Sequence, residues 1–169
     1  VVTGPDWDIA VSASVISVTV REKAVLEKDN TPVDIIPGMY AAQAVVTRHM
    51  QLSDGQSKEF RNTSNQAPFM ISPRVETISV LAGSVVTVIG YIFQYMDGGT
   101  DVLIDAIEVY TGEIKLVRNS VVLFSPGEFK VINAATMQIN IPGPLTAGMQ
   151  IPLRIVIEGA ESRPVWINV

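Results

Sequence analysis

The chain has no cysteine, so disulfide bridges and thiolate metal sites are excluded, and the redox state of its compartment is left open. It has a single histidine, His49, which leaves few options for general acid–base chemistry. It also lacks a basic tract, and 17 acidic against 12 basic residues give a net charge of -5. Because duplex binding needs clustered Lys and Arg to neutralise phosphates, we expect no nucleic-acid partner.

Long apolar runs are missing as well. The most apolar segment, residues 80–93, is shorter than the roughly 18 residues that a membrane-spanning helix needs, and Gly83 and Gly90 interrupt it. We therefore expect no membrane span. The first residues show no basic region followed by an apolar block, so we expect no signal peptide. Since the chain starts at Val1 and not at Met, we expect a fragment of a longer protein or a processed form.

A short pattern is present twice, at residues 37–71 and 147–167. Each copy has a glycine turn, a strand with apolar residues at every second position, a polar loop that includes serine, and a closing strand with Pro, an aromatic residue and Ile. The closing strands contain Pro68-Phe69-Met70-Ile71 and Pro164-Val165-Trp166-Ile167. A repeat of this size predicts two copies of one small β-domain and argues against a single enzyme fold.

A period of two runs through most of the chain, and we find no amphipathic helix. Residues 8–26, rich in β-branched side chains, predict one long strand. Ser53-Asp54-Gly55-Gln56 predicts a hairpin turn, residues 58–71 a returning strand that Pro68 places at an edge or bulge, and residues 96–101 the loosest loop. A hairpin is predicted at residues 107–116 and a strand at residues 119–124.

Short strands with a turn about every ten residues are typical of an antiparallel sandwich. Ser72-Pro73-Arg74 resembles a joint between two parts. We therefore predict an all-β chain with a smaller or incomplete β-domain at residues 1–72 and an antiparallel β-sandwich at residues 73–169.

Two groups of polar residues are candidates for catalysis or metal binding. His49 lies near Ser53, Ser57 and Asp54, which suggests a hydrolytic set. Catalytic triads, however, are assembled from distant segments, and no G-x-S-x-G motif is present, so we expect His49 to face solvent at the shoulder of a hairpin. We predict that the chain is not an enzyme and has no catalytic residues.

Asp97, Asp101 and Asp105 follow each other at a spacing of four residues. A calcium loop would place its ligands at positions 1, 3 and 5 and supply a late Glu, and this pattern is absent. We expect a solvated loop here, with an opportunistic cation site as the lesser alternative, and we predict no metal and no cofactor.

Most aromatic side chains occupy period-two positions, so we expect them in the core. Trp166 in particular should close the sandwich from the last strand. Tyr91 and Tyr95 flank the loop near Asp97 and are predicted to form an exposed pair.

Residues 73–169 carry a series of motifs in a familiar order: Gly83, T-V-I-G-Y-I-F at 87–93, V-Y-T-G at 109–112, I-N-I-P at 139–142 and E-G-A-E-S at 158–162. This half resembles the immunoglobulin-like IPT/TIG domain. The resemblance implies an immunoglobulin-like β-sandwich.

Residues 40–73, followed by this TIG-like domain, look like the C-terminal part of the cap, or tube-terminating adaptor, proteins of contractile injection systems, which are phage-tail-like particles. The resemblance implies a structural protein at the end distal to the baseplate, which contacts sheath, tube and cap subunits and forms a homo-oligomer. It implies assembly in the bacterial cytoplasm and leaves open a later release from the cell. The family's N-terminal α/β domain is not seen here beyond the strand expected at residues 8–26, so no contact residues carry over.

Two alternatives stay open. TIG-like domains are also found in bacterial surface adhesins and beside sugar-acting enzymes, and a carbohydrate-associated module would need an exposed row of aromatic residues. A small hydrolase that uses His49 is the more remote alternative.

Overall fold

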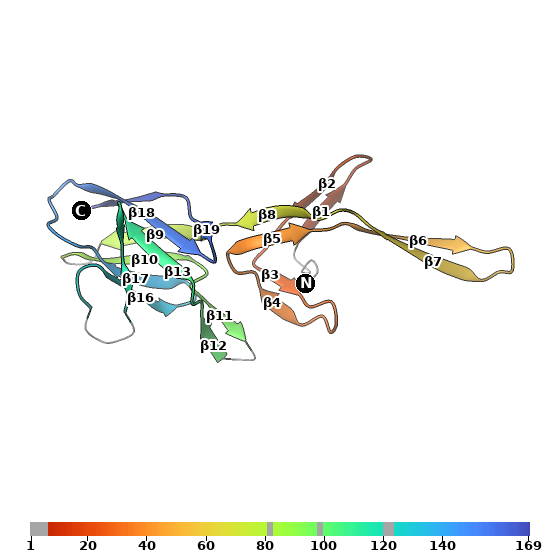
Figure 1. Cartoon of the computed structure of the whole chain (residues 1–169), viewed down its shortest axis with the longest axis horizontal. Coiled ribbons are helices and arrows are strands. Elements are labelled where there is room, and N and C mark those ends of the chain that lie inside the picture. The colour runs from red at the N-terminus through yellow and green to blue at the C-terminus, as the bar shows by residue number, and fades with distance from the viewer. Residues whose placement is uncertain (1–6, 81–82, 98–99, 120–123) are drawn as a thin grey trace.

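The structure, a computed structural model, describes residues 7–80, 83–97, 100–119 and 124–169. In these ranges the chain forms twenty short strands and no helix, which confirms the all-β prediction. Figure 1 shows an elongated molecule in which the second half forms a layered body, while strands from the first half extend away from it. The described residues offer no helix that could cross a membrane.

Two sheets of short strands form the body, which comprises the described residues from 73 to 169. The first has the order β15-β16-β17-β10-β9, and in the second β14-β13-β18-β19 is extended by β20, which pairs with β18. All neighbours are antiparallel except β15 and β16. The bounds are β9 (Arg74–Val80), β10 (Val85–Tyr91), β13 (Ile107–Thr111), β14 (Ile114–Lys115), β15 (Val117–Arg118), β16 (Glu128–Asn133), β17 (Thr136–Asn140), β18 (Gln150–Ile157), β19 (Ala160–Glu161) and β20 (Val165–Asn168).

Inward-facing residues of both sheets share one hydrophobic core. Every second residue of β18 is buried, as its alternating sequence predicts, and Leu153 and Ile155 have no exposed surface. Val86 on β10 and Met137 on β17 reach the same core from the other sheet. Burying one such side chain contributes roughly 1.5–3 kcal/mol, so the core stabilises the body.

A hairpin outside the two main sheets corrects one prediction. Residues 94–103 form β11 (Gln94–Asp97) and β12 (Thr100–Leu103), where the sequence predicted a loose loop at 96–101. The turn residues 98–99, and residues 120–123 of the strand predicted at 119–124, lie outside the described part of the chain.

Residues 7–72, the N-terminal region, form four separate two-stranded ladders and no larger sheet among the described residues. The prediction of one strand over residues 8–26 is wrong, because the chain reverses at Ser12, whose backbone N–H donates to the Val15 carbonyl at 2.8 Å. The turn contains neither Gly nor Pro, so the period of two continues through it. The ladders pair β1 (Asp8–Val11) with β2 (Ile16–Thr19), β3 (Lys23–Val25) with β4 (Pro32–Asp34), β5 (Gly38–Ala42) with β8 (Ala67–Ile71), and β6 (Val45–Gln51) with β7 (Ser57–Thr63).

The repeated pattern corresponds to one repeated strand pair. Tyr40 on β5 lies opposite Phe69 on β8, and Pro152 on β18 lies opposite Trp166 on β20. The first pair forms a two-stranded ladder, whereas the second is built into a sheet of the body. The similarity therefore extends to the strand pair and not to a complete domain.

Candidate functional site

The hairpin of β6 and β7, residues 45–63, which we call the arm, is exposed along its whole length. Its strands pair in register from Val45 opposite Thr63 to Gln51 opposite Ser57. The predicted turn is confirmed: Gly55 adopts a φ of 81°, and the Asp54 carboxylate accepts a hydrogen bond from the Gln56 N–H at 2.9 Å. Every residue of the arm is exposed, and Figure 1 shows it extending away from the body.

The two faces of the arm differ in chemistry. One face carries the cross-strand pairs Val46–Asn62, Arg48–Phe60 and Met50–Lys58, and the other includes Thr47, His49 and Glu59. On the first face Met50 is 54% and Phe60 is 39% exposed, and the Lys58 ammonium lies 5.3 Å from the centre of the Phe60 ring. This surface, which we call the apolar-cationic face, contains two positive charges and no carboxylate.

Ser64 lies at the base of the arm. The Ser64 N–H donates to the Ala44 carbonyl at 2.9 Å, and the Ser64 hydroxyl accepts from the Ala44 N–H at 2.9 Å. A serine hydroxyl that bonds the backbone in this way competes with the regular ladder. The strand predicted at residues 58–71 is accordingly divided into β7 and β8, and the arm is a ladder separate from β5 and β8.

A second uncovered apolar surface lies on β1 and β2. Ile9 faces Val18 and Val11 faces Ile16 across this ladder, and all four side chains are exposed. A two-stranded ladder is at best marginally stable in water, because one of its faces normally has to be buried. The N-terminal region therefore presents apolar surface on two ladders that nothing in the described part of the chain covers.

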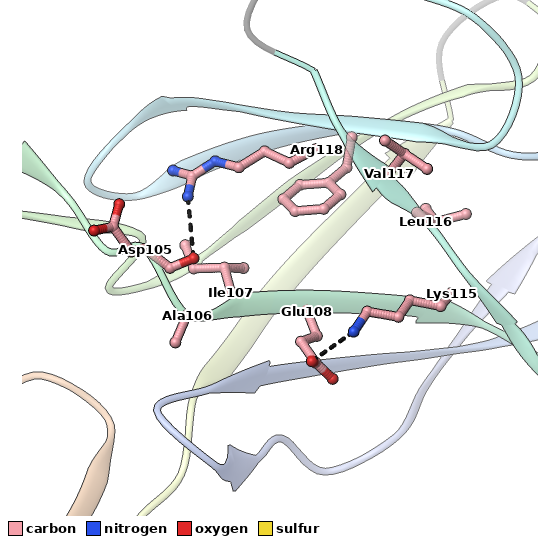
Figure 2. A pocket seen from close by; sticks show the side chains of 9 residues that line it. Asp105, Ala106, Ile107, Glu108, Lys115, Leu116, Val117 and Arg118 are labelled. Atoms are coloured by element: carbon pink, nitrogen blue, oxygen red, sulfur yellow. Dashed lines mark hydrogen bonds and ion pairs between the residues drawn. The ribbon is translucent and has the colours of Figure 1, made fainter.

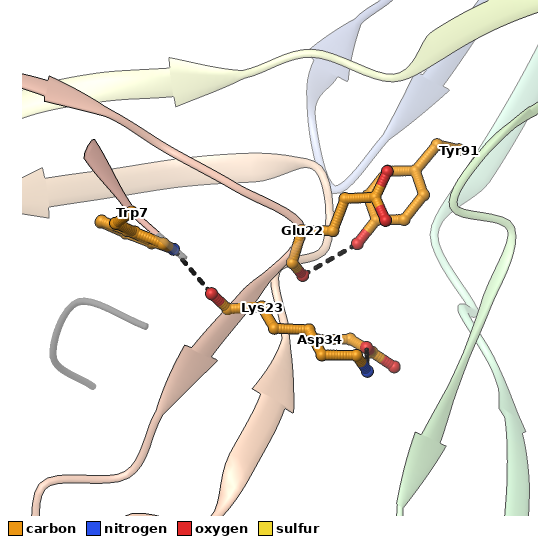
Figure 3. A network of polar contacts seen from close by, with 5 residues as sticks. All are labelled: Trp7, Glu22, Lys23, Asp34 and Tyr91. Atoms are coloured by element: carbon orange, nitrogen blue, oxygen red, sulfur yellow. Dashed lines mark hydrogen bonds and ion pairs between the residues drawn. The ribbon is translucent and has the colours of Figure 1, made fainter. Parts of the chain in front are cut away.

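Hydrogen bonds and ion pairs connect the N-terminal region to the body (Figure 3). The Tyr91 hydroxyl at the end of β10 donates to the Glu22 carbonyl at 2.9 Å, and Arg74 forms an ion pair with the Glu22 carboxylate at 3.3 Å. Burial of the Tyr91 hydroxyl is the main cause that raises its pKa, and the nearby Glu22 carboxylate is the second. The hydroxyl therefore stays protonated and can donate this hydrogen bond. On the N-terminal side, Lys23 is paired with Asp34 at 2.7 Å.

A pocket of about 730 Å³ lies at this joint, lined in part by Ile35, Ile71 and Arg74. Tyr91 also lines it, and Tyr95 packs against the core, so the prediction that these two tyrosines form an exposed pair is wrong. Their side chains help hold the molecule together.

A second pocket, of about 430 Å³, lies on the body (Figure 2). Its charged groups are engaged locally: Lys115 contacts the Glu108 carboxylate at 2.5 Å, and the Arg118 guanidinium donates to the Ile104 carbonyl at 2.8 Å. Two hydrogen bonds lower the pKa of Glu108: the one from Lys115 has the larger effect, and the one from Tyr110 is second. No serine, cysteine or histidine is present among the described lining residues. Among these residues the pocket therefore offers no hydroxyl or thiol nucleophile and no imidazole base.

The residues considered for hydrolysis lie along the arm and do not converge. His49 is exposed on β6 opposite Glu59, as expected for a solvent-facing histidine, and Ser57 faces Gln51. Asp54 is used in the turn.

The acidic residues near β12 do not form a metal site in the described part of the chain. Asp101 and Asp105 are exposed, and the described residues contain no group of three or more His, Cys, Asp or Glu side chains that could hold a metal ion.

The aromatic residues are divided between core and surface. Phe93 and Phe129 are fully buried, but the prediction that Trp166 closes the sandwich is wrong, since its side chain is 57% exposed. Its neighbour Ile167 is the buried residue of β20, because alternate residues of a strand face opposite sides. Trp166 lies on β20 of the body and the exposed Phe60 on β7 of the arm, which extends away from the body (Figure 1), so these two aromatic residues do not lie side by side.

The exposure of the whole arm is not among the predictions made from the sequence. One signal was available: residues 57–63 read Ser-Lys-Glu-Phe-Arg-Asn-Thr, with one apolar residue in seven. A strand with a polar residue at nearly every position has no face to contribute to a core.

Comparisons of the chain with protein-family models, with curated proteins and with solved structures found no match.

Proposed function

We propose that this chain is a structural component of a large protein assembly and acts through protein–protein contacts made by its N-terminal region. The observation that carries the proposal is that the arm exposes every one of its residues, including Val46, Met50 and Phe60. Long strand edges that are left open are sites at which other chains add. A partner that covers the arm would supply the burial that the hairpin lacks in this chain.

In finer detail, we propose that the body is an immunoglobulin-like, TIG-like sandwich. Two packed layers with a shared core fit that architecture. The motif glycines also lie where turns need them: Gly112 between β13 and β14 has a φ of 59°, and Gly159 between β18 and β19 has a φ of 78°. Both support the alignment of this half with the family.

We further propose that the assembly is a contractile injection system and that the chain belongs to the cap, or tube terminator, at the end distal to the baseplate. The resemblance of residues 40–73 to the cap proteins leads to this placement, and an arm without a core of its own suits a part that is completed by neighbouring sheath, tube or cap subunits. The proposal includes a homo-oligomer, assembly in the bacterial cytoplasm, and a role without catalysis.

Imaging of labelled particles tests the placement. A tag on the body, placed after Val169 and away from the arm, would be decorated with gold in a particle preparation from cells that make the full assembly. We expect the label at one end only, opposite the baseplate. Label along the whole shaft, or absence of label from that end, would contradict the placement.

A further inference from the structure

Charge is distributed unevenly between the arm and the rest of the chain. The arm contains three basic and two acidic residues, so the remaining residues of the chain hold nine basic and fifteen acidic ones. The arm therefore has a net charge of +1, and the remaining residues of the chain have a net charge of -6. Both charges on the apolar-cationic face, Arg48 and Lys58, are positive. Such a face is complementary to an acidic surface that also carries apolar side chains.

Neither cation of this face is paired with a carboxylate in the described part of the chain. Lys58 lies over Phe60 instead. Across the ladder Arg48 faces Phe60 and Met50 faces Lys58, so charged and apolar groups alternate in both directions. The matching surface should alternate carboxylates with an apolar side chain in the same way.

One described segment has this pattern. Asp101 and Leu103 lie on the same side of β12, Asp105 follows two residues later, and all three are exposed, Leu103 by 49%. Neither Asp101 nor Asp105 forms an ion pair among the described residues. Within that part of the chain, β12 pairs only with β11, so no further strand lies beside it in its sheet.

The arm of one molecule does not contact β12 of the same molecule. Figure 1 shows the arm directed away from the body, whereas β11 and β12 lie beside the body. A contact between the two surfaces must therefore join two molecules, with different patches on each side. Contacts of this heterologous kind propagate from copy to copy and close into rings or continue as filaments.

We propose that the apolar-cationic face of the arm packs on the exposed side chains of β12 and of the bend that follows it on a second copy of this chain, with Arg48 and Lys58 opposite Asp101 and Asp105. The inference rests on the proposed function, since it names the partner of the same arm. It adds that the homo-oligomer is built by an arm-to-body contact whose specificity comes from opposite charges.

Light scattering after size-exclusion chromatography of the whole chain, over a concentration series, tests the proposal. We expect concentration-dependent association that weakens as salt rises, because contacts between exposed charges are screened. The double variant R48Q/K58Q should weaken association by at least about tenfold, which corresponds to about 1.4 kcal/mol. The control T47E/Q51E changes the net charge by the same amount on the opposite face of the arm and should associate like the original chain.

A charge exchange gives the sharper result. The variants R48E/K58E and D101K/D105K should each fail to associate alone, and an equal mixture of the two should associate again, because each supplies the surface that complements the other. All substituted positions are exposed, so a near-ultraviolet circular dichroism spectrum like that of the original chain should show an intact body.

Several outcomes would overturn the inference. These are a chain that stays monomeric at every concentration, an R48Q/K58Q variant that associates normally, and a mixture of the charge-exchanged variants that does not recover. A monomer whose arm binds vesicles of anionic lipid, or a purified sheath or tube subunit, would also overturn it and would assign the arm to that partner. Particle imaging is independent of these measurements, so failure of the self-contact and failure of the proposed function are distinguishable.

Discussion

Removal of the arm should leave the stability of the body almost unchanged. The arm buries none of its residues, and among the described residues the ion pair of Arg61 with Glu27 at 3.4 Å is the only ion pair between a side chain of β6 or β7 and a residue outside the arm. Both side chains are mostly exposed, 57% and 67%, and an exposed pair contributes about 0–1 kcal/mol. For a chain of this size we expect the melting temperature to fall by less than about 4 °C.

The geometry at the base of the arm permits a clean deletion. Ala44 and Ser64 already face each other through two hydrogen bonds of 2.9 Å, so an Asn-Gly turn can replace residues 45–63. Thermal unfolding followed by circular dichroism would give the melting temperature, and light scattering would show whether self-association is lost.

A matched core variant calibrates the assay. Phe93→Ala removes a ring with no exposed surface and should cost about 3–5 kcal/mol, many degrees more than the deletion. If the deletion lowered the melting temperature as much as Phe93→Ala, the arm would have to pack on the body and could not be a free contact surface.

Three further substitutions test the joint and the surface. Gly90→Ala would place a Cβ 2.2 Å from the Arg74 carbonyl oxygen, and we expect a loss near the upper end of about 1–3 kcal/mol in denaturant unfolding. Tyr91→Phe removes the 2.9 Å bond to the Glu22 carbonyl and should cost about 0.5–1.5 kcal/mol at neutral pH. Because the pKa of Tyr91 is raised on folding from its usual value near 10, the stability from its neutral hydroxyl is fully present below about pH 10 and declines progressively as the pH rises above it, so the variant should lose less stability than the original chain at alkaline pH. Trp166→Ala should change the free energy of unfolding by less than about 1 kcal/mol, because most of the ring is in solvent.

Each of these has a result that would contradict it. Gly143→Ala is the control for Gly90→Ala, since the nearest atom to its new Cβ is 3.9 Å away, and equal losses for the two would show that the close approach to Arg74 is unimportant. If Tyr91→Phe and the original chain lost the same stability at alkaline pH, the Tyr91 hydroxyl would not stabilise the joint. A loss above about 2 kcal/mol for Trp166→Ala would place that ring in a packed contact.

Local sequence predicted the elements whose information is contained in neighbouring residues. Alternation identified β18 and its buried face, and Asp54-Gly55 identified the turn of the arm, because strand period and turn conformation depend on the residues themselves. The reversal at Ser12 was missed because no Gly or Pro marks it. Trp166 was misplaced by one position, which in a strand moves a side chain from the core to solvent.

The sequence by itself determined that this protein is all-β and where its charges and apolar residues fall along the chain, since period and composition are local properties. Only the tertiary structure decided which apolar faces meet one another. It placed the strands of the second half around one core and left the arm, with Val46, Met50 and Phe60, in solvent. The physical reason is that burial depends on which segments meet in space. The alternation of apolar and polar residues along a strand is the same whether its apolar face is covered or exposed.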